Sequence, residues 1–157
     1  MTFTFLSSSL SRFGVDVSVF SFASKVLMAY GALMWLACAV TYIISLDDVR
    51  TIREVGIWIK PMKFMAATAL FAGSTAWLTH LANASISHGE AYKGICALLV
   101  ATSLFEVLYI TYQASLGEAS HYNNTEALHA FLYSVMGIVA VGLTASQAWL
   151  AWEIWKA

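Results

Sequence analysis

The chain has 157 residues, of which 60% are hydrophobic and 11% are charged. Ordinary soluble domains contain about 45–50% apolar and about 25% charged residues, so this composition excludes that class and predicts a membrane protein. The net charge of −1 provides no basic surface for nucleic acid, and we expect no nucleic-acid partner.

The first 25 residues precede the first long apolar run and begin MTFTFLSSSLSRFGVDVSVFSF. They lack the positively charged start, the apolar stretch and the small-residue cleavage site of a secretory signal peptide. We therefore predict that residues 1–25 form an interfacial N-terminal segment.

Four apolar runs follow, each close to the roughly 20 residues that a helix needs to cross about 30 Å of hydrocarbon. The connections between them are short, so we predict one domain over residues 26–157. The predicted fold is all-α: a polytopic membrane protein with four transmembrane helices in an up-down bundle. The spans are expected at about 26–46, 64–82, 95–116 and 127–152.

An even number of spans places both termini and the 83–94 connection on one side of the membrane. The 47–63 and 117–126 connections then share the other side. Each side receives four of the eight Lys and Arg residues, so the positive-inside rule predicts no orientation.

The two cysteines lie at different predicted depths in the bundle. Cys38 falls deep in the first span and Cys96 at the start of the third, a difference of roughly 15 Å at about 1.5 Å per residue. A disulfide requires Cα atoms within roughly 7 Å. We predict two free cysteines that pack as small apolar side chains.

Glu106 is the most informative residue of the third span, because it lies within an apolar run. An acidic side chain at the centre of a membrane helix costs about 2.5–3.5 kcal/mol and is expected to face protein or water. Thr102, Tyr109 and Gln113 fall on the same helical face. We predict a polar stripe that leads from Glu106 toward the 117–126 connection.

The second span begins at that same side of the membrane. Pro61 suits the first turn of a helix, where its missing N–H is not needed, and Lys63 follows in the sequence. The flexible Lys63 side chain could reach inward to Glu106 or outward to lipid headgroups, and both interpretations stay open.

The 117–126 connection and the fourth span complete a predicted pocket. Gly117 can end the third helix in a left-handed cap, and Asn123 with Glu126 resembles a capping box. Capping explains neither Ser120 nor His121. The fourth span adds polar side chains that begin at the same face. The predicted ligand-binding residues are Lys63, Glu106, Tyr109, Gln113, Ser120, His121, Asn123, His129 and Tyr133.

IKPMKF at 59–64 contains the pattern K-P-x-K-F, and FEVLYITYQASLGEASHYN at 105–123 contains Q-A-x-x-G-x-x-S-H-[FY]-N; YSVMG at 133–137 is a third segment of interest. In these three segments the chain resembles a family of small bacterial four-helix integral membrane proteins of no established activity. The resemblance covers about half of the chain. It implies a multi-pass protein of the bacterial inner (cytoplasmic) membrane, and it directs attention to Lys60, Pro61, Lys63, Gln113, Ser120, His121 and Asn123.

The pattern favours an integral membrane protein whose polar intramembrane pocket binds a small molecule, a lipid headgroup or an ion. One alternative is a non-catalytic accessory or assembly subunit, in which the polar cluster only holds the helices together. Another is a proton-coupled transporter that uses Glu106. The expected partners are membrane lipids, and further copies of the chain or a larger membrane complex are possible.

Enzymatic chemistry also stays open. A reaction on a lipid or quinone would use His121 as general base and Ser120 as nucleophile or donor, and a haem or metal would have to use His121 with His129. The sequence contains no recognisable metal-binding motif. It identifies no catalytic residue and no cofactor.

Overall fold

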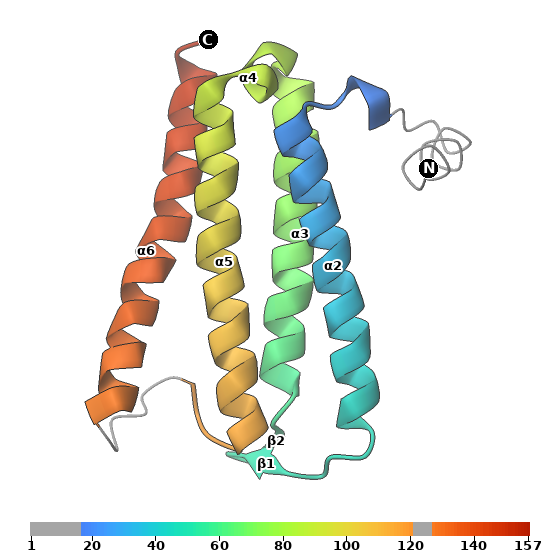
Figure 1. The fold of residues 1–157 in the computed structure, drawn as a ribbon, viewed down its shortest axis with the longest axis vertical. Coiled ribbons are helices and arrows are strands. Elements are labelled where there is room, and N and C mark those ends of the chain that lie inside the picture. The colour runs from blue at the N-terminus through green and yellow to red at the C-terminus, as the bar shows by residue number, and fades with distance from the viewer. Residues whose placement is uncertain (1–16, 121–126) are drawn as a thin grey trace.

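The computed structural model describes residues 17–120 and 127–157, whose secondary structure consists of helices and one small hairpin (Figure 1). The predicted all-α class is therefore confirmed. The described elements are the 3-10 helix η1 (Val17–Val19), the helices α2 (Phe22–Ser45), α3 (Ile59–Ala82), α4 (Ala84–His88), α5 (Glu90–Leu116) and α6 (Ala127–Trp155), and the strands β1 (Thr51–Ile52) and β2 (Val55–Gly56).

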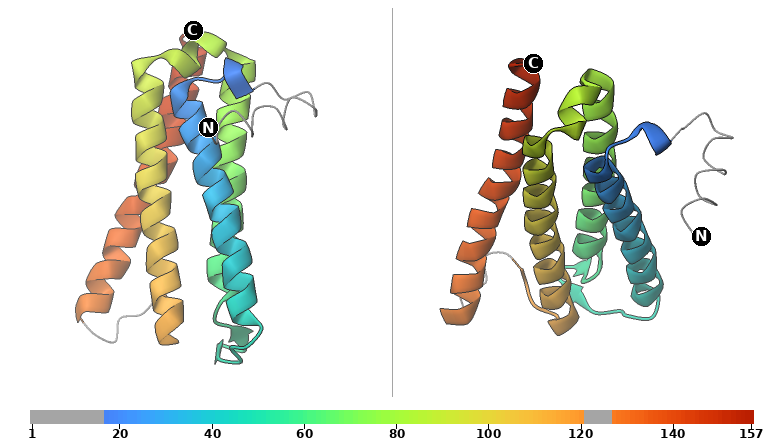
Figure 2. Two further views of the ribbon diagram at one scale, coloured as in Figure 1. Left: turned by 45° about the vertical axis from the view of Figure 1, so that its right-hand side comes forward. Right: turned by 45° about the horizontal axis from the view of Figure 1, so that its top comes forward.

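The long helices α2, α3, α5 and α6 lie side by side, and each runs opposite to the one before it (Figures 1 and 2). The closest pairings are α2 with α3 and α5 with α6, while α5 also contacts α3 and α2. The hairpin lies at the same end as the last turn of α5, whereas α4 and the C-terminus lie at the opposite end. We call the first of these the hairpin end.

In the part of the chain that the structure describes, three helices are long and apolar enough to cross a membrane: Phe22–Ser45, Glu90–Leu116 and Ala130–Trp155. Three of the predicted spans thus have a candidate helix. Helix α3 is as long as α2, but polar residues such as Ser74, Thr75 and His80 lower its hydropathy. A fourth span and an up-down arrangement across a membrane stay predictions.

Two predicted helix ends are confirmed. Pro61 lies in the first turn of α3. Gly117 caps α5 with φ of 75°, in the left-handed region that glycine adopts without strain. The Gly117 N–H donates to the Ala114 carbonyl at 2.9 Å, and the Glu118 N–H donates to the Gln113 carbonyl at 2.9 Å. The cap therefore satisfies carbonyls that the helix end leaves without partners.

Small residues allow α2 and α3 to approach closely. A side chain at Gly31 of α2 would place its Cβ 3.0 Å from the Ala69 carbonyl oxygen and 3.7 Å from the Gly73 nitrogen, both on α3. The apolar core lies beside this contact and contains Leu27, Ala72, Ala76, Ile95 and Leu99, which have no exposed surface.

The hairpin between α2 and α3 was not predicted from the sequence. Strands β1 and β2 pair through Thr51 with Gly56 and Ile52 with Val55, so a two-residue turn joins them. Its residues, Arg53 and Glu54, have φ of 51° and 67°. Such turns need positive φ at both positions and are usually made by Asn and Gly, so this turn is strained.

Glu54→Gly should stabilise the protein by about 1 kcal/mol, because glycine adopts positive φ without the Cβ clash that other residues pay. Thermal unfolding in mild detergent measures the change. Gly117→Ala is the matched control, since it forces a Cβ into φ of 75° and should shift the melting temperature the other way. A lower melting temperature for Glu54→Gly would show that its side chain stabilises the turn.

Candidate functional site

A pocket of about 250 Å³ lies at the hairpin end, between the hairpin, the start of α3, the end of α5 and residues 118–120. Its walls are mainly apolar, and polar groups stand among them. The apolar lining residues are Ile52, Val55, Ile57, Pro61, Ile110, Ala114 and Ala119; the polar ones are Arg53, Lys60, Glu118 and Ser120, with Gly56 beside them.

Lys60 and Ser120 close one side of this pocket. The Lys60 Nζ donates a hydrogen bond of 2.6 Å to the Ser120 Oγ, and Ser120 is 4% exposed. This bond ties the first turn of α3 to the segment that follows α5. Burial, and to a smaller extent the nearby Arg53 guanidinium, lower the pKa of Lys60. Two cationic side chains therefore act on each other at the pocket.

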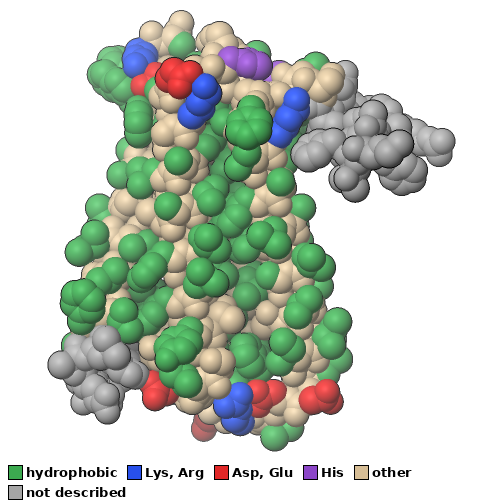
Figure 3. Space-filling view, viewed as in Figure 1, with side chains coloured by type: hydrophobic (Ala, Val, Ile, Leu, Met, Phe, Trp, Pro, Cys, Tyr) green, Lys and Arg blue, Asp and Glu red, His purple; other side chains and the backbone are tan. Residues whose placement is uncertain are grey.

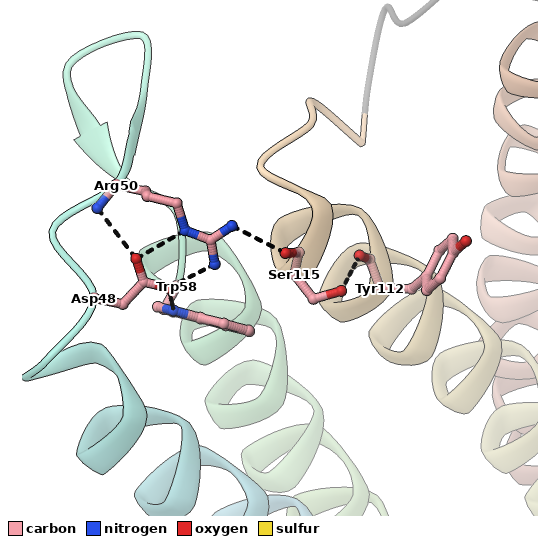
Figure 4. Close-up of polar contacts among 5 residues, drawn as sticks. All are labelled: Asp48, Arg50, Trp58, Tyr112 and Ser115. Carbon is pink, nitrogen blue, oxygen red and sulfur yellow. Dashed lines mark hydrogen bonds and ion pairs between the residues drawn. The ribbon is translucent and has the colours of Figure 1, made fainter.

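Arg50 makes a second set of contacts at the hairpin end, as Figure 4 shows. Its guanidinium donates to both Asp48 carboxylate oxygens, at 2.9 and 2.7 Å, and to the Ser115 carbonyl at 3.1 Å. The Trp58 indole N–H donates to the same carboxylate at 2.8 Å. The Ser115 carbonyl belongs to the last turn of α5, so Arg50 joins the α2–α3 connection to the end of that helix.

Asp48→Asn should weaken the pH dependence of stability. The hydrogen bonds from Arg50, and next those from Trp58, hold the pKa of Asp48 well below its usual range. The stability from this depressed pKa is complete above the unfolded-state value of about 4 and is lost as the pH falls toward the folded-state value. The measurement is thermal unfolding in detergent from neutral pH downward.

The control for this prediction is Asp47→Asn. Asp47 is exposed, and its side chain forms no hydrogen bond or ion pair with another described residue. We expect this variant to keep the wild-type decline in melting temperature at acidic pH, whereas Asp48→Asn should start lower at neutral pH and decline less. Identical profiles for the two variants would contradict the role given to Asp48.

A row of polar side chains lies in the interior beyond the pocket. The predicted stripe of α5 is buried along its length: Thr102, Glu106, Tyr109 and Gln113. Beside it, the Tyr30 hydroxyl of α2 and the Ser103 hydroxyl of α5 are 2.9 Å apart and share a hydrogen bond. The Tyr109 hydroxyl and the Gln113 Oε1 are buried and have no hydrogen-bond partner among the described residues.

Tyr109 lies where three helices meet. With Ile110 it packs against Met136 of α6 and Phe64 of α3. The sequence predicted pocket walls from these same helices. The structure therefore places Tyr109 in a contact among α3, α5 and α6.

The structure divides the predicted residue set between two places. Ser120 lines the pocket, whereas Glu106, Tyr109 and Gln113 are buried in the row. Lys63 is exposed and does not line the pocket. The lysine that lines it is Lys60. Tyr133 is half-buried on α6. His121 and Asn123 lie outside the described residues, and so does the side chain of His129.

Arg53 and Glu118 line the pocket but were not predicted as site residues. The signal that could have found Arg53 is weak: a charged Arg-Glu pair between Thr-Ile and Val-Gly in TIREVG. Its turn lacks the Asn and Gly that normally mark a hairpin. Glu118 follows the predicted Gly117 cap by one residue, and that placement alone pointed to the same end of α5.

Within residues 17–120 and 127–157, no group of three or more His, Cys, Asp or Glu residues could hold a metal ion. Cys38 and Cys96 are free, as predicted. Fold and site thus define an all-helical protein with three helices that can cross a membrane and a pocket at the hairpin end. No model of a known protein family, no curated protein and no solved structure matches the chain, so the family resemblance stays a prediction.

Proposed function

We propose that the protein binds, in the pocket at the hairpin end, an amphiphile that carries a phosphate or carboxylate group. Arg53 and Lys60 supply positive charge, and the Ser120 hydroxyl adds a further polar group. The two cations outnumber the one carboxylate of the lining, Glu118, and an anion beside them would form charge-assisted hydrogen bonds. This pairing of two cations at one mainly apolar pocket is the observation that carries the proposal.

The apolar walls support an amphiphile rather than a fully hydrated anion. Ile52, Val55 and Ile57 come from the hairpin side, and Ile110 and Ala114 from α5. Ligand sites commonly combine apolar walls with a few convergent polar groups that fix orientation. The headgroup of an anionic lipid presents both chemistries at a membrane surface.

The proposed setting is a four-span, up-down bundle in the bacterial inner membrane, with α3 as the fourth span. The polar residues Thr68, Thr75 and Thr79 of α3 are buried, while its exposed side chains include Leu70 and Leu78. Charged side chains gather near the two ends on the face drawn in Figure 3, with apolar side chains between them. In this setting the pocket lies at headgroup depth.

The test is native mass spectrometry of the delipidated protein with added phosphatidylglycerol or phosphatidylcholine. We expect saturable retention of phosphatidylglycerol and weaker retention of phosphatidylcholine. Glycerol 3-phosphate as competitor distinguishes a lipid site from a site for a free phosphate ester: competition at similar concentrations would identify the free ester. Equal binding of both lipids would reject the proposal.

Ala119→Trp tests the location. Ala119 lines the pocket and is half-buried, so an indole there would occupy the space without entering the core. We expect this variant to lose phosphatidylglycerol while keeping the wild-type melting temperature. Retained selective binding would place the anion elsewhere on the protein.

A further inference from the structure

Two buried oxygen atoms in the interior row have no hydrogen-bond partner among the described residues. Gln113 is 1% exposed and Tyr109 is 6% exposed, yet the Gln113 Oε1 and the Tyr109 hydroxyl accept and donate no hydrogen bond among the described residues. The Gln113 amide and the Tyr109 hydroxyl lie near each other, but no hydrogen bond of acceptable geometry joins the Tyr109 hydroxyl to Gln113. A buried polar group without a partner costs about 1–3 kcal/mol, and ordered water is the usual remedy. This part of α5 therefore has the chemistry of a water site.

Glu106 lies about 10 Å further into the bundle, seven residues before Gln113 on the same helical face. It is 8% exposed and forms no hydrogen bond or ion pair with a described residue. Burial without a cation favours the neutral carboxylic acid. The titratable side chains that the described parts of the surrounding helices bring to this half of the bundle are Tyr30, Cys38 and Tyr42 of α2, Lys60 and Lys63 of α3, Tyr109 and Tyr112 of α5 and Tyr133 of α6.

Those lysines do not pair with Glu106. Lys60 donates to Ser120, and Lys63 is exposed. Tyr30, which interacts electrostatically with Glu106, shares its hydroxyl hydrogen bond with Ser103. Glu106 thus has hydroxyl groups near it and no described counter-ion.

The row is closed at one end and approaches the pocket at the other. Beyond Ser103 the interior is filled by Leu27, Ala72 and Leu99, none of which has exposed surface. Toward the hairpin end, Ile110 lines the pocket and packs in one cluster with Tyr109.

We propose that water enters from the pocket end to a buried site formed by Gln113 and Tyr109, and that Glu106 is a carboxylic acid that exchanges its proton with this water. In each exchange the acid O–H gives its proton to a water molecule while the carboxyl takes another proton from water. The carboxyl therefore ends neutral, and no oxidant or reductant takes part. The site needs no ligand in the pocket.

Infrared spectroscopy of the full-length protein tests this proposal. The protein is kept in an ester-free detergent at neutral pH, with no lipid added. We expect a protonated-carboxyl C=O band that is absent in Glu106→Gln. After transfer to D2O the band should shift long before the protected backbone amides of the core exchange. Gln113→Leu should keep the band and slow its shift about tenfold or more.

Thr111→Val is the matched control, because Thr111 lies on the same helix and its hydroxyl donates only to the Val107 carbonyl. It should exchange at the wild-type rate. The proposal is overturned if no band depends on Glu106, if the band exchanges only with the core amides, or if Gln113→Leu and Thr111→Val exchange alike. The last comparison stands even if Glu106→Gln fails to fold. Because no phosphatidylglycerol or other anionic lipid is added, these outcomes are independent of the proposed lipid site.

Discussion

Gly31→Leu is expected to destabilise the protein by about 3 kcal/mol or more and to reduce the yield of folded protein in detergent. The new Cβ would lie 3.0 Å from a backbone oxygen of α3, which cannot move aside as a flexible side chain can. Overpacking typically costs about 1–3 kcal/mol, and here the rest of the leucine side chain adds to the clash. Thermal unfolding followed by circular dichroism measures the loss.

Gly137→Leu is the matched control for this prediction. Gly137 lies on α6, is exposed, and has no heavy atom within 4 Å of a built Cβ. The same substitution should therefore leave the melting temperature unchanged or raise it, since leucine favours helix more than glycine does. If both variants melt alike, the close packing of α2 on α3 does not limit stability.

Lys60→Met is expected to weaken the binding of phosphatidylglycerol by about tenfold or more. The change removes the charged donor but keeps a long, apolar side chain. Hydrogen bonds to charged groups contribute about 1.5–3 kcal/mol, which corresponds to about tenfold or more in affinity. Native mass spectrometry over a range of lipid concentrations gives the ratio.

Lys63→Met removes the same charge one helical turn further along α3, from an exposed side chain that does not line the pocket. It should bind phosphatidylglycerol nearly as the wild type does. Equal losses in the two variants would mean that the lipid senses the general charge of this surface. Binding would then not depend on the pocket.

Local patterns predicted the features that depend on a few neighbouring residues. Gly117 ends α5 in a left-handed cap, and Pro61 lies in the first turn of α3. The burial of Glu106 and Gln113 follows from helical spacing, because residues seven apart share a face. Such features need no knowledge of the partner helices.

The position of the pocket depended on contacts that the sequence does not display. Lys60 and Lys63 are three residues apart, and the choice between them rests on where residues 118–120 fold back. The hairpin has strands of only two residues and a turn without Asn or Gly, so neither alternation nor turn chemistry marked it. The short helix α4 was missed as well, although Asn83 caps it through a bond to the Ser85 N–H.

The bonds made by Arg50 and Lys60 have a thermodynamic consequence. One joins the α2–α3 connection to the Ser115 carbonyl, and the other joins α3 to Ser120, so these segments of the hairpin end are held together before any ligand arrives. A ligand that binds next to these segments immobilises little additional backbone. The entropy of ordering that binding normally loses is therefore small here, and even a modest set of contacts can give measurable affinity.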